Sequence, residues 1–381
     1  MAVTWYGGND LRGLSSDEKP SAPEGTTFFE IDTGNVFIRY SSAWVGVDPS
    51  FSMGGCPPCF LYKDADEIYI PAGRYYQVGH RIDGQYQDLA RKNFYWDVAA
   101  QFAVDIDAAY SAGSTSGMVG GDVVSSCYSV FMVDTDEIMI LPFIRVDTIA
   151  YSDPNTTITP AAHADGTTAA NGFVNAADCF NGYRLVLIVT DPTKNGTTFT
   201  IADSTDGTPD GILITGDVTA TIAATNSLQM IPPAGTQFCY LGSVVLDSEG
   251  NILSFTRTGW HTHYNAIQTV TGTGATSPRN DDLGRVIPPV AKKVSLSFHD
   301  ATAAQGSNVL IASGASGSTS DYYGMYNHYG GSSYAGNIQV SPPHDYVLTQ
   351  ISTIRNQIRS YVNGANVAAS TCNILIYGWD E

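Results

Sequence analysis

Apolar and polar residues alternate over short stretches of this chain, and clusters of Gly, Asn, Asp and Pro separate the stretches. Alternation with a period of two places apolar side chains on one face of a strand, whereas the 3.6-residue period of an amphipathic helix is almost absent. Turn-forming sequences at 32–35, 194–196 and 248–251 bound several of the apolar runs. The pattern predicts strands at 27–31, 36–40, 68–70, 128–133, 138–144, 184–189, 197–202, 239–246, 294–298 and 374–377.

Short strands at regular spacing predict an all-β fold of β-sandwich or jelly-roll domains. Residues 1–47 contain an expected β-hairpin, and because a two-stranded hairpin is marginal alone, we expect this segment to dock on something larger. Residues 48–272 carry most of the strands and are predicted to form a jelly-roll-like β-sandwich. A polar linker then leads to a second predicted sandwich at 286–381.

One stretch, 348–361, allows two interpretations. Its apolar residues are spaced 3, 3, 4 and 3 apart, which would suit one face of a helix. Several of them also share a strand face, and Asn363-Gly364 is a strong hairpin turn. We favour a strand here. A weak sequence similarity between residues 64–71 and 134–142 does not establish a repeat.

Composition narrows the classes of function. The 381 residues are 43% hydrophobic and only 14% charged, with a net charge of -19, whereas charged residues usually make up about 25% of a soluble domain. Duplex binding draws on Lys and Arg, so the 18 scattered basic residues argue against a nucleic-acid partner. The first residues lack a signal-peptide pattern, and no run approaches about 20 apolar residues. We expect a protein made in the cytoplasm without a signal peptide and not associated with a membrane.

The six cysteines are too few for a disulfide scaffold, and Cys127 and Cys239 lie in apolar, strand-like surroundings. Cys56 and Cys59 form a CPPC, which could be a redox pair or half of a zinc site. No second CxxC or paired histidine follows at a suitable spacing, and no βαβ pattern surrounds it. Buried or unreactive thiols are the simpler interpretation, and we expect no cofactor.

Acidic clusters are the first candidates for a metal site. Asp203, Asp206 and Asp210 lie in DSTDGTPDG, where neighbouring carboxylates could wrap a calcium ion. The order of an EF-hand loop is not met, and turn-forming Asp on a solvated loop is the commoner explanation. The same reservation applies to Asp64, Asp66 and Glu67 and to Asp134, Asp136 and Glu137.

The pair His261 and His263 brackets Thr262, so on a strand both rings project from one face, close enough to share a metal. A third ligand would have to come from elsewhere in the fold, with His80 and His299 as candidates that the sequence does not place. Paired histidines beside aromatic residues are more often part of an interface, and the arrangement we consider is three such pairs that converge on a symmetry axis. We therefore predict no metal and keep these residues as candidates.

Enzyme signatures are missing from the sequence. It has no G-x-S-x-G, no H-E-x-x-H and no P-loop order, although two glycosidase carboxylates would leave no recognisable trace. We expect no catalytic residue. Aromatic residues are instead candidates for interaction, because Tyr supplies contact area at low entropic cost, although the Tyr-rich loop could equally fold over its own sheet. These candidates are Trp260, Tyr322, Tyr323, Tyr326, His328 and Tyr329.

Two parts of the chain resemble known sequences. GLSSDEKP at 13–20, followed by GTTFFEIDTGNVFI at 25–38 and Ala43-Trp44, resembles a leader found in many tailed-bacteriophage virion proteins. The ending, STCNILIYGW at 370–379, is similar to the terminal strands of β-sandwich domains in phage fibres and head appendages, although a Gly usual in that family is replaced by Ser370 or Thr371.

The resemblance implies a non-enzymatic structural component of a virion, such as a capsid decoration protein, head fibre or tail-associated protein. It implies assembly with other virion proteins and with copies of itself, by analogy as a trimer, and it makes Phe28, Phe29 and Trp44 candidates for interaction. The alternatives are a tail-fibre adhesin that binds host glycan through 260–264 and 322–329, and a polysaccharide hydrolase. Low charge suits surfaces that become interfaces, and the acidic excess would keep free subunits apart.

Overall fold

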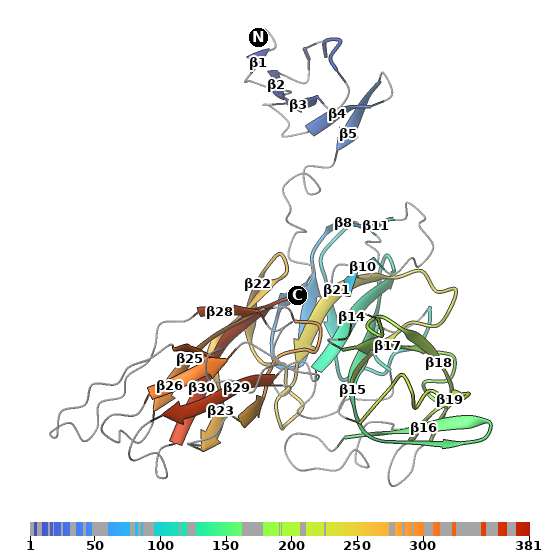
Figure 1. Cartoon of the computed structure of the whole chain (residues 1–381). Coiled ribbons are helices and arrows are strands. Elements are labelled where there is room, and N and C mark those ends of the chain that lie inside the picture. Colours follow the sequence, from blue (N-terminus) through green and yellow to red (C-terminus); the bar gives the residue numbers. More distant parts are fainter. Residues whose placement is uncertain are drawn as a thin grey trace, which may run out of the picture. The chain divides into compact units, whose positions relative to one another are not determined.

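A computed structural model describes most of the chain, and within the described part it contains strands and no helices (Figure 1). No helix there is long and apolar enough to cross a membrane. The described residues are 4–5, 10–13, 16–17, 19–23, 26–30, 36–40, 43–47, 60–76, 81–82, 85–86, 95–113, 116–119, 127–161, 178–189, 191, 193–205, 211–224, 226–273, 279–283, 286–291, 293–300, 308–312, 322–324, 344–347, 357–363 and 371–381.

The chain forms two compact units. Unit 1 comprises Met1–Cys59 together with Thr258–Trp260, and unit 2 comprises Phe60–Arg257 with His261–Glu381. The domain boundaries expected from the sequence, at 47 and within 272–286, stay predictions.

Unit 1 contains a five-stranded sheet in the order β1-β2-β3-β4-β5. The predicted hairpin is present as β3 and β4, which pair Thr27 with Ile38 and Phe28 with Phe37. β5 extends this hairpin on one side, and β2 pairs with β3 in parallel on the other. The predicted hairpin is therefore part of a five-stranded sheet. Its strands are β1 (Thr4–Trp5), β2 (Asp10–Gly13), β3 (Thr27–Glu30), β4 (Val36–Tyr40) and β5 (Ala43–Val47).

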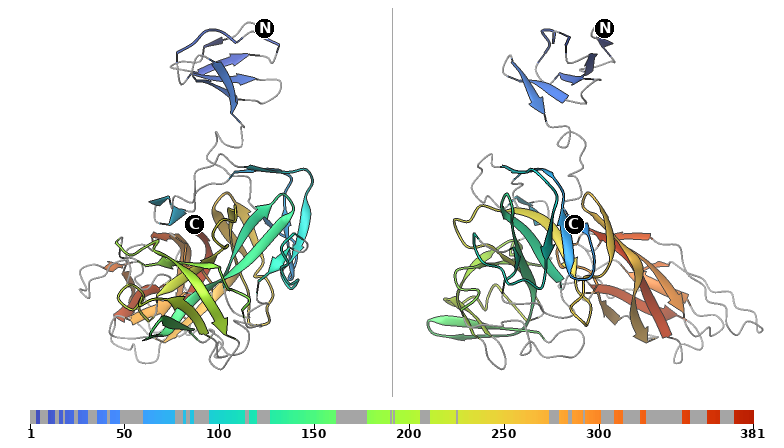
Figure 2. Two further views of the ribbon diagram at one scale, coloured as in Figure 1. Left: turned by 90° about the vertical axis from the view of Figure 1, so that its right-hand side faces the viewer. Right: turned by 180° about the vertical axis from the view of Figure 1, so that it is seen from behind.

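Six antiparallel strands of unit 2 close into a barrel in the order β15-β16-β19-β18-β17-β20, with β20 returning to β15. Figure 2 shows these green and yellow-green strands from two further sides. They are β15 (Glu137–Ser152), β16 (Asn155–Pro160), β17 (Arg184–Ile188), β18 (Thr198–Thr205), β19 (Gly211–Thr215) and β20 (Ser227–Ile231).

The length and irregularity of two strands explain the closure. β15 pairs with β20 in its middle and with β16 at its end, and its register shifts between Val146 and Thr148. β18 shifts between Ile201 and Asp203, where it leaves β17 for β19. Such bulges bend a strand and increase its twist, which a closed sheet requires. The all-β prediction is confirmed, and in this region its form is a barrel.

The barrel interior is filled by apolar side chains, as is usual for a small barrel. Leu185, Leu187, Leu228, Met230 and Ile212 are completely buried there. Strands β14 and β21 continue the sheet beyond β15, and β13 pairs with β15 in parallel. These strands are β13 (Gly117–Met118), β14 (Cys127–Asp134) and β21 (Cys239–Val245).

A second apolar core combines side chains of the barrel region with those of the last part of the chain. It includes Cys127 of β14, Phe143 of β15, and Ile374, Ile376 and Trp379 of β30. The last part of the chain forms two sheets, β22-β23-β30-β25-β28 and β24-β29-β26-β27. Their strands are β22 (Phe255–Thr258), β23 (His261–Thr273), β24 (Arg279–Asp282), β25 (Lys293–Asp300), β26 (Asn308–Ala312), β27 (Tyr322–Gly324), β28 (His344–Val347), β29 (Gln357–Asn363) and β30 (Thr371–Asp380).

Three small sheets complete unit 2, in the orders β12-β7-β6, β11-β8 and β10-β9. Each strand position predicted from alternation coincides with a strand, and the described part of 348–361 belongs to β29, as favoured; residues 348–356 lie outside the described part. The remaining strands are β6 (Leu61–Tyr62), β7 (Glu67–Ile70), β8 (Gly73–Tyr76), β9 (Arg81–Ile82), β10 (Gln85–Tyr86), β11 (Tyr95–Val98) and β12 (Phe102–Asp105).

Candidate functional site

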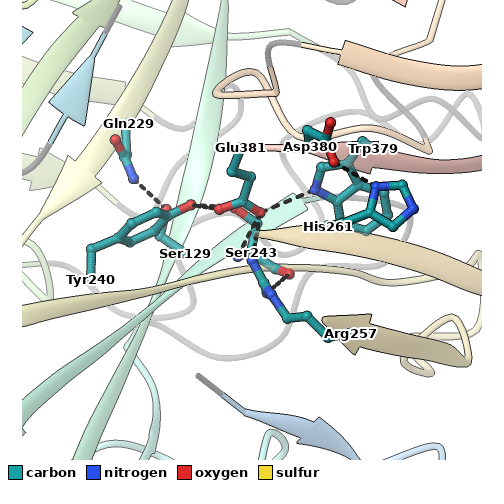
Figure 3. Close-up of polar contacts among 9 residues, drawn as sticks. All are labelled: Ser129, Gln229, Tyr240, Ser243, Arg257, His261, Trp379, Asp380 and Glu381. Carbon is teal, nitrogen blue, oxygen red and sulfur yellow. Dashed lines mark hydrogen bonds and ion pairs between the residues drawn. The ribbon is translucent and has the colours of Figure 1, made fainter. Parts of the chain in front are cut away.

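Unit 2 contains a buried polar cluster where β21, β22 and the end of β30 meet (Figure 3). We call it the junction cluster. Charged groups are rarely buried unless they are paired and hydrogen-bonded, so a buried cluster of this kind is the first place to examine for function. Its members are Tyr240, Ser243, Arg257, Trp379 and Glu381.

The carboxylate of Glu381 lies at the centre of the junction cluster. Its Oε2 accepts a hydrogen bond from the Tyr240 hydroxyl at 2.6 Å. Its Oε1 accepts the backbone N–H of Ser243 at 3.0 Å and the indole N–H of Trp379 at 3.1 Å. The Nη2 of Arg257 lies 3.3 Å from the same Oε1. Donors on both oxygens fix the position and orientation of this carboxylate.

The guanidinium of Arg257 is completely buried and is held on several sides. Its Nη1 donates to the carbonyl of Ser243 at 3.4 Å, and its central carbon lies 4.7 Å from the centre of the Phe60 ring. Gly242 has a φ of +128°, and a Cβ at this position would lie 2.1 Å from Nη2. The glycine therefore leaves the space that the guanidinium occupies.

The Tyr240 hydroxyl is the remaining titratable group of the junction cluster. Burial raises its pKa well above the ordinary value, and the negative charge of Glu381 adds to the effect. The hydroxyl stays protonated and lies 2.6 Å from the hydroxyl of Ser243. On neighbouring strands, the amide of Gln229 donates to the buried Ser129 hydroxyl at 2.8 Å (Figure 3). The arrangement is suited to holding β21, β22 and β30 together, and it presents no activated nucleophile.

Next to the junction cluster, His261 and Asp380 form a second pair across β23 and β30. The two residues are register partners, and Nδ1 lies 2.5 Å from the carboxylate. The ring of His263 stacks on that of His261, with centroids 6.3 Å apart and an interplanar angle of 23°. The two histidines thus share a face, as the spacing predicts. Among the described residues no group of three or more His, Cys, Asp or Glu could hold a metal ion.

Only some of the other candidate residues can be placed. Asp203 lies half-buried on β18, and Trp260 is half-buried. Tyr322 and Tyr323 belong to β27, and His299 to β25, but their side chains lie outside the described part. The candidates that lie wholly outside it are Cys56, Cys59, His80, Asp206, Asp210, Tyr326, His328 and Tyr329.

The two other acidic clusters, at 64–67 and 134–137, lie in hairpin turns. In the turn before β7, the backbone N–H of Asp66 donates to the Asp64 carboxylate at 3.1 Å, and Lys63 forms an ion pair with Glu67. In the turn between β14 and β15, the N–H of Thr135 donates to Asp134 at 2.7 Å. Carboxylates that accept nearby backbone N–H groups stabilise turns, which is the simpler of the two interpretations given above.

The leader residues lie in unit 1. Phe28 is completely buried, so it contributes to the interior of the unit rather than to its surface. Trp44 is half-buried, its ring meets Phe28 edge-on at 5.9 Å, and its indole N–H donates to the carbonyl of Pro20 at 2.9 Å. Phe29 lies on β3, and its side chain is outside the described part.

The junction cluster was not predicted from the sequence. One signal was present, because the alternation in 255–258 places Arg257 on the same face as the buried Phe255. An arginine on the inner face of a strand requires an acidic partner, but Glu381 lies 124 residues further on and nothing in the spacing connects the two.

Neither the protein-family models nor the curated proteins contain a match to this chain. A solved structure with some likeness is that of SGBP-B from a complex xyloglucan utilization locus in Bacteroides uniformis, which is 11% identical. The alignment covers 84% of this chain and 96% of that chain, with a TM-score of 0.15. A TM-score this low carries no argument about fold or function.

Proposed function

We propose that this chain is a non-enzymatic structural component of a tailed-bacteriophage virion, either on the head or associated with the tail. It attaches through unit 1 and assembles with copies of itself through its β domains. The observation that carries this proposal is that the residues of the phage-like leader contact one another within unit 1.

These contacts join segments that are distant in the sequence. The ammonium of Lys19 lies 4.0 Å from the centre of the Phe37 ring and 5.1 Å from that of Phe28. Phe28 meets Trp44, whose indole N–H reaches Pro20. A leader shared by otherwise different proteins must fold without help from the rest of each chain. Contacts among its own residues can stabilise such a fold. That property suits an attachment module.

Expression of a chain lacking 1–47 during infection by the phage that encodes it tests the attachment. We expect the shortened chain to be absent from purified particles while its barrel retains a cooperative unfolding transition. The full-length Tyr151→Ala chain, altered at an exposed position of unit 2, is the control and should be incorporated normally. Incorporation of the shortened chain at the wild-type level would disprove the proposal.

Self-assembly is a separate part of the proposal. Size-exclusion chromatography with light scattering of the full chain should give the mass of a homo-oligomer, and by family analogy that of a trimer. A monomer at micromolar concentration would contradict this part and leave the attachment experiment to decide the rest.

A further inference from the structure

Arg184 is a half-buried cation at the end of the barrel where β17 begins. It pairs in register with Thr200 of β18 and Ile231 of β20. Its Nε–H donates to the carbonyl of Pro232 at 3.0 Å, and its guanidinium carbon lies 6.0 Å from the centre of the buried Phe238 ring. These two contacts fix the orientation of the guanidinium plane.

The outer part of this guanidinium has no partner within the part of the chain that the structure describes. Among the described residues, its two Nη groups have no acceptor and form no ion pair, whereas Arg257 is paired with Glu381 and Lys63 with Glu67. Burial lowers the pKa of Arg184, and no acidic group among the described residues counteracts this. The side chain remains charged because a guanidinium is not deprotonated in proteins.

A guanidinium in this state is prepared to bind a carboxylate. Its fork of N–H donors matches the two oxygens of a carboxylate, and it is already partly dehydrated and oriented before a partner arrives. Both effects reduce the desolvation and ordering costs that usually cancel the gain from an ion pair at a surface.

The overall charge indicates which carboxylate is involved. The chain has 37 acidic and 18 basic residues, so copies that meet must overcome mutual repulsion. A contact that places an acidic side chain of one copy on an unpaired cation of another offsets part of this repulsion. We propose that Arg184 binds the carboxylate of an Asp or Glu side chain from a second copy of this chain. This inference rests on the self-assembly part of the proposed function.

Sedimentation equilibrium of the full chain and two matched variants tests it. Arg184→Gln removes the charge and the fork of donors, whereas Lys194→Gln removes one charge from the turn between β17 and β18, where Nζ donates to the carbonyl of Ala220. We expect Arg184→Gln to raise the dissociation constant of self-association at least about tenfold, and Lys194→Gln to change it less than about twofold. An equal effect of both variants, or no effect of Arg184→Gln, would overturn the inference.

A second measurement keeps the test decisive if Arg184→Gln folds poorly. Arg184→Lys keeps the charge and loses the fork, so its affinity should lie between those of the wild type and Arg184→Gln. Raising the salt from about 0.1 to about 0.5 M screens the repulsion between copies in both proteins but the ion pair only in the wild type, so the ratio of their two dissociation constants should fall. Equal salt dependence of the two would count against the ion pair.

The remaining outcomes separate this inference from the proposed function. If the variant self-associates normally but no longer enters particles, the partner is another virion protein and the inference is wrong while attachment stands. If the wild type is monomeric, the inference is wrong and the leader deletion alone decides the proposed function.

Discussion

Arg257 and Glu381 form an ion pair that is almost completely withdrawn from solvent, with exposed side-chain fractions of 0% and 3% and an Nη2–Oε1 distance of 3.3 Å. The pair joins β22 to the residue that follows β30, and Ser243 of β21 bonds to both partners. Isolated surface pairs contribute little to stability, but a buried pair becomes a large liability when one partner is removed.

Glu381→Gln should therefore destabilise unit 2 by about 3–5 kcal/mol in urea unfolding, because Arg257 would remain charged and buried without a counter-charge. The control is Asp380→Asn, which breaks the partly exposed pair with His261 and should change stability by no more than about 1 kcal/mol. The double variant Arg257→Met/Glu381→Leu should be less destabilised than Glu381→Gln. If it is more destabilised, the packing and hydrogen bonds of the cluster matter more than its charges.

Gly242→Ala tests whether the guanidinium depends on the space beside this glycine. A Cβ there would overlap Nη2 of Arg257, in addition to the strain of an alanine at a φ of +128°. Gly235→Ala is the matched control, since its φ is +90° and nothing lies within 4 Å of the added Cβ. We expect a loss of about 1–2 kcal/mol for the control and a clearly larger loss for Gly242→Ala. Equal losses would show that Arg257 moves aside freely.

Alkaline pH should destabilise unit 2. Burial raises the pKa of Tyr183 to about 12 and raises those of Tyr240 and Tyr264 well above the ordinary value. The folded state then holds protons that the unfolded state releases from about pH 10. Stability is complete below that pH and falls as the pH rises, between about 10 and 12 for Tyr183.

Urea unfolding at several pH values, combined with the absorbance of tyrosinate, measures this loss. Tyr264→Phe removes the hydroxyl that donates to the Val286 carbonyl at 2.5 Å, so it should lower stability at neutral pH and flatten the alkaline decline. An unchanged alkaline slope in both Tyr264→Phe and Tyr183→Phe would contradict the assignment.

A core substitution in unit 1 and one in unit 2 should each act on its own unit. Phe28→Ala removes a fully buried ring from unit 1 and should cost about 3–5 kcal/mol there, whereas Phe131→Ala should do the same in the barrel region. Limited proteolysis followed by mass spectrometry would locate the newly accessible sites, within 1–59 for Phe28→Ala and within 60–381 for Phe131→Ala. If the protease cleaves either variant in both units, the two units fold cooperatively.

The all-β class followed from the sequence because strand alternation depends only on neighbouring residues. The segments 128–133 and 138–144 carry this pattern over several residues, and they form β14 and most of the first half of β15. The turns that contain Asp64 and Asp134 could also be predicted from the sequence, because each carboxylate accepts a hydrogen bond from a backbone N–H within two residues. The shared face of His261 and His263 is likewise a consequence of their spacing on a strand.

Tertiary structure alone decided what joins distant segments. Closure of the barrel depends on β15 pairing with both β16 and β20, and alternation cannot distinguish this from a sandwich because both bury one face of each strand. The leader hairpin became part of a larger sheet through its pairing with β2 and β5. Arg257 and Glu381 lie far apart in the sequence, and no local sequence pattern identifies the partner of a buried charge. Only the folded chain, by removing both groups from water, makes their pairing necessary.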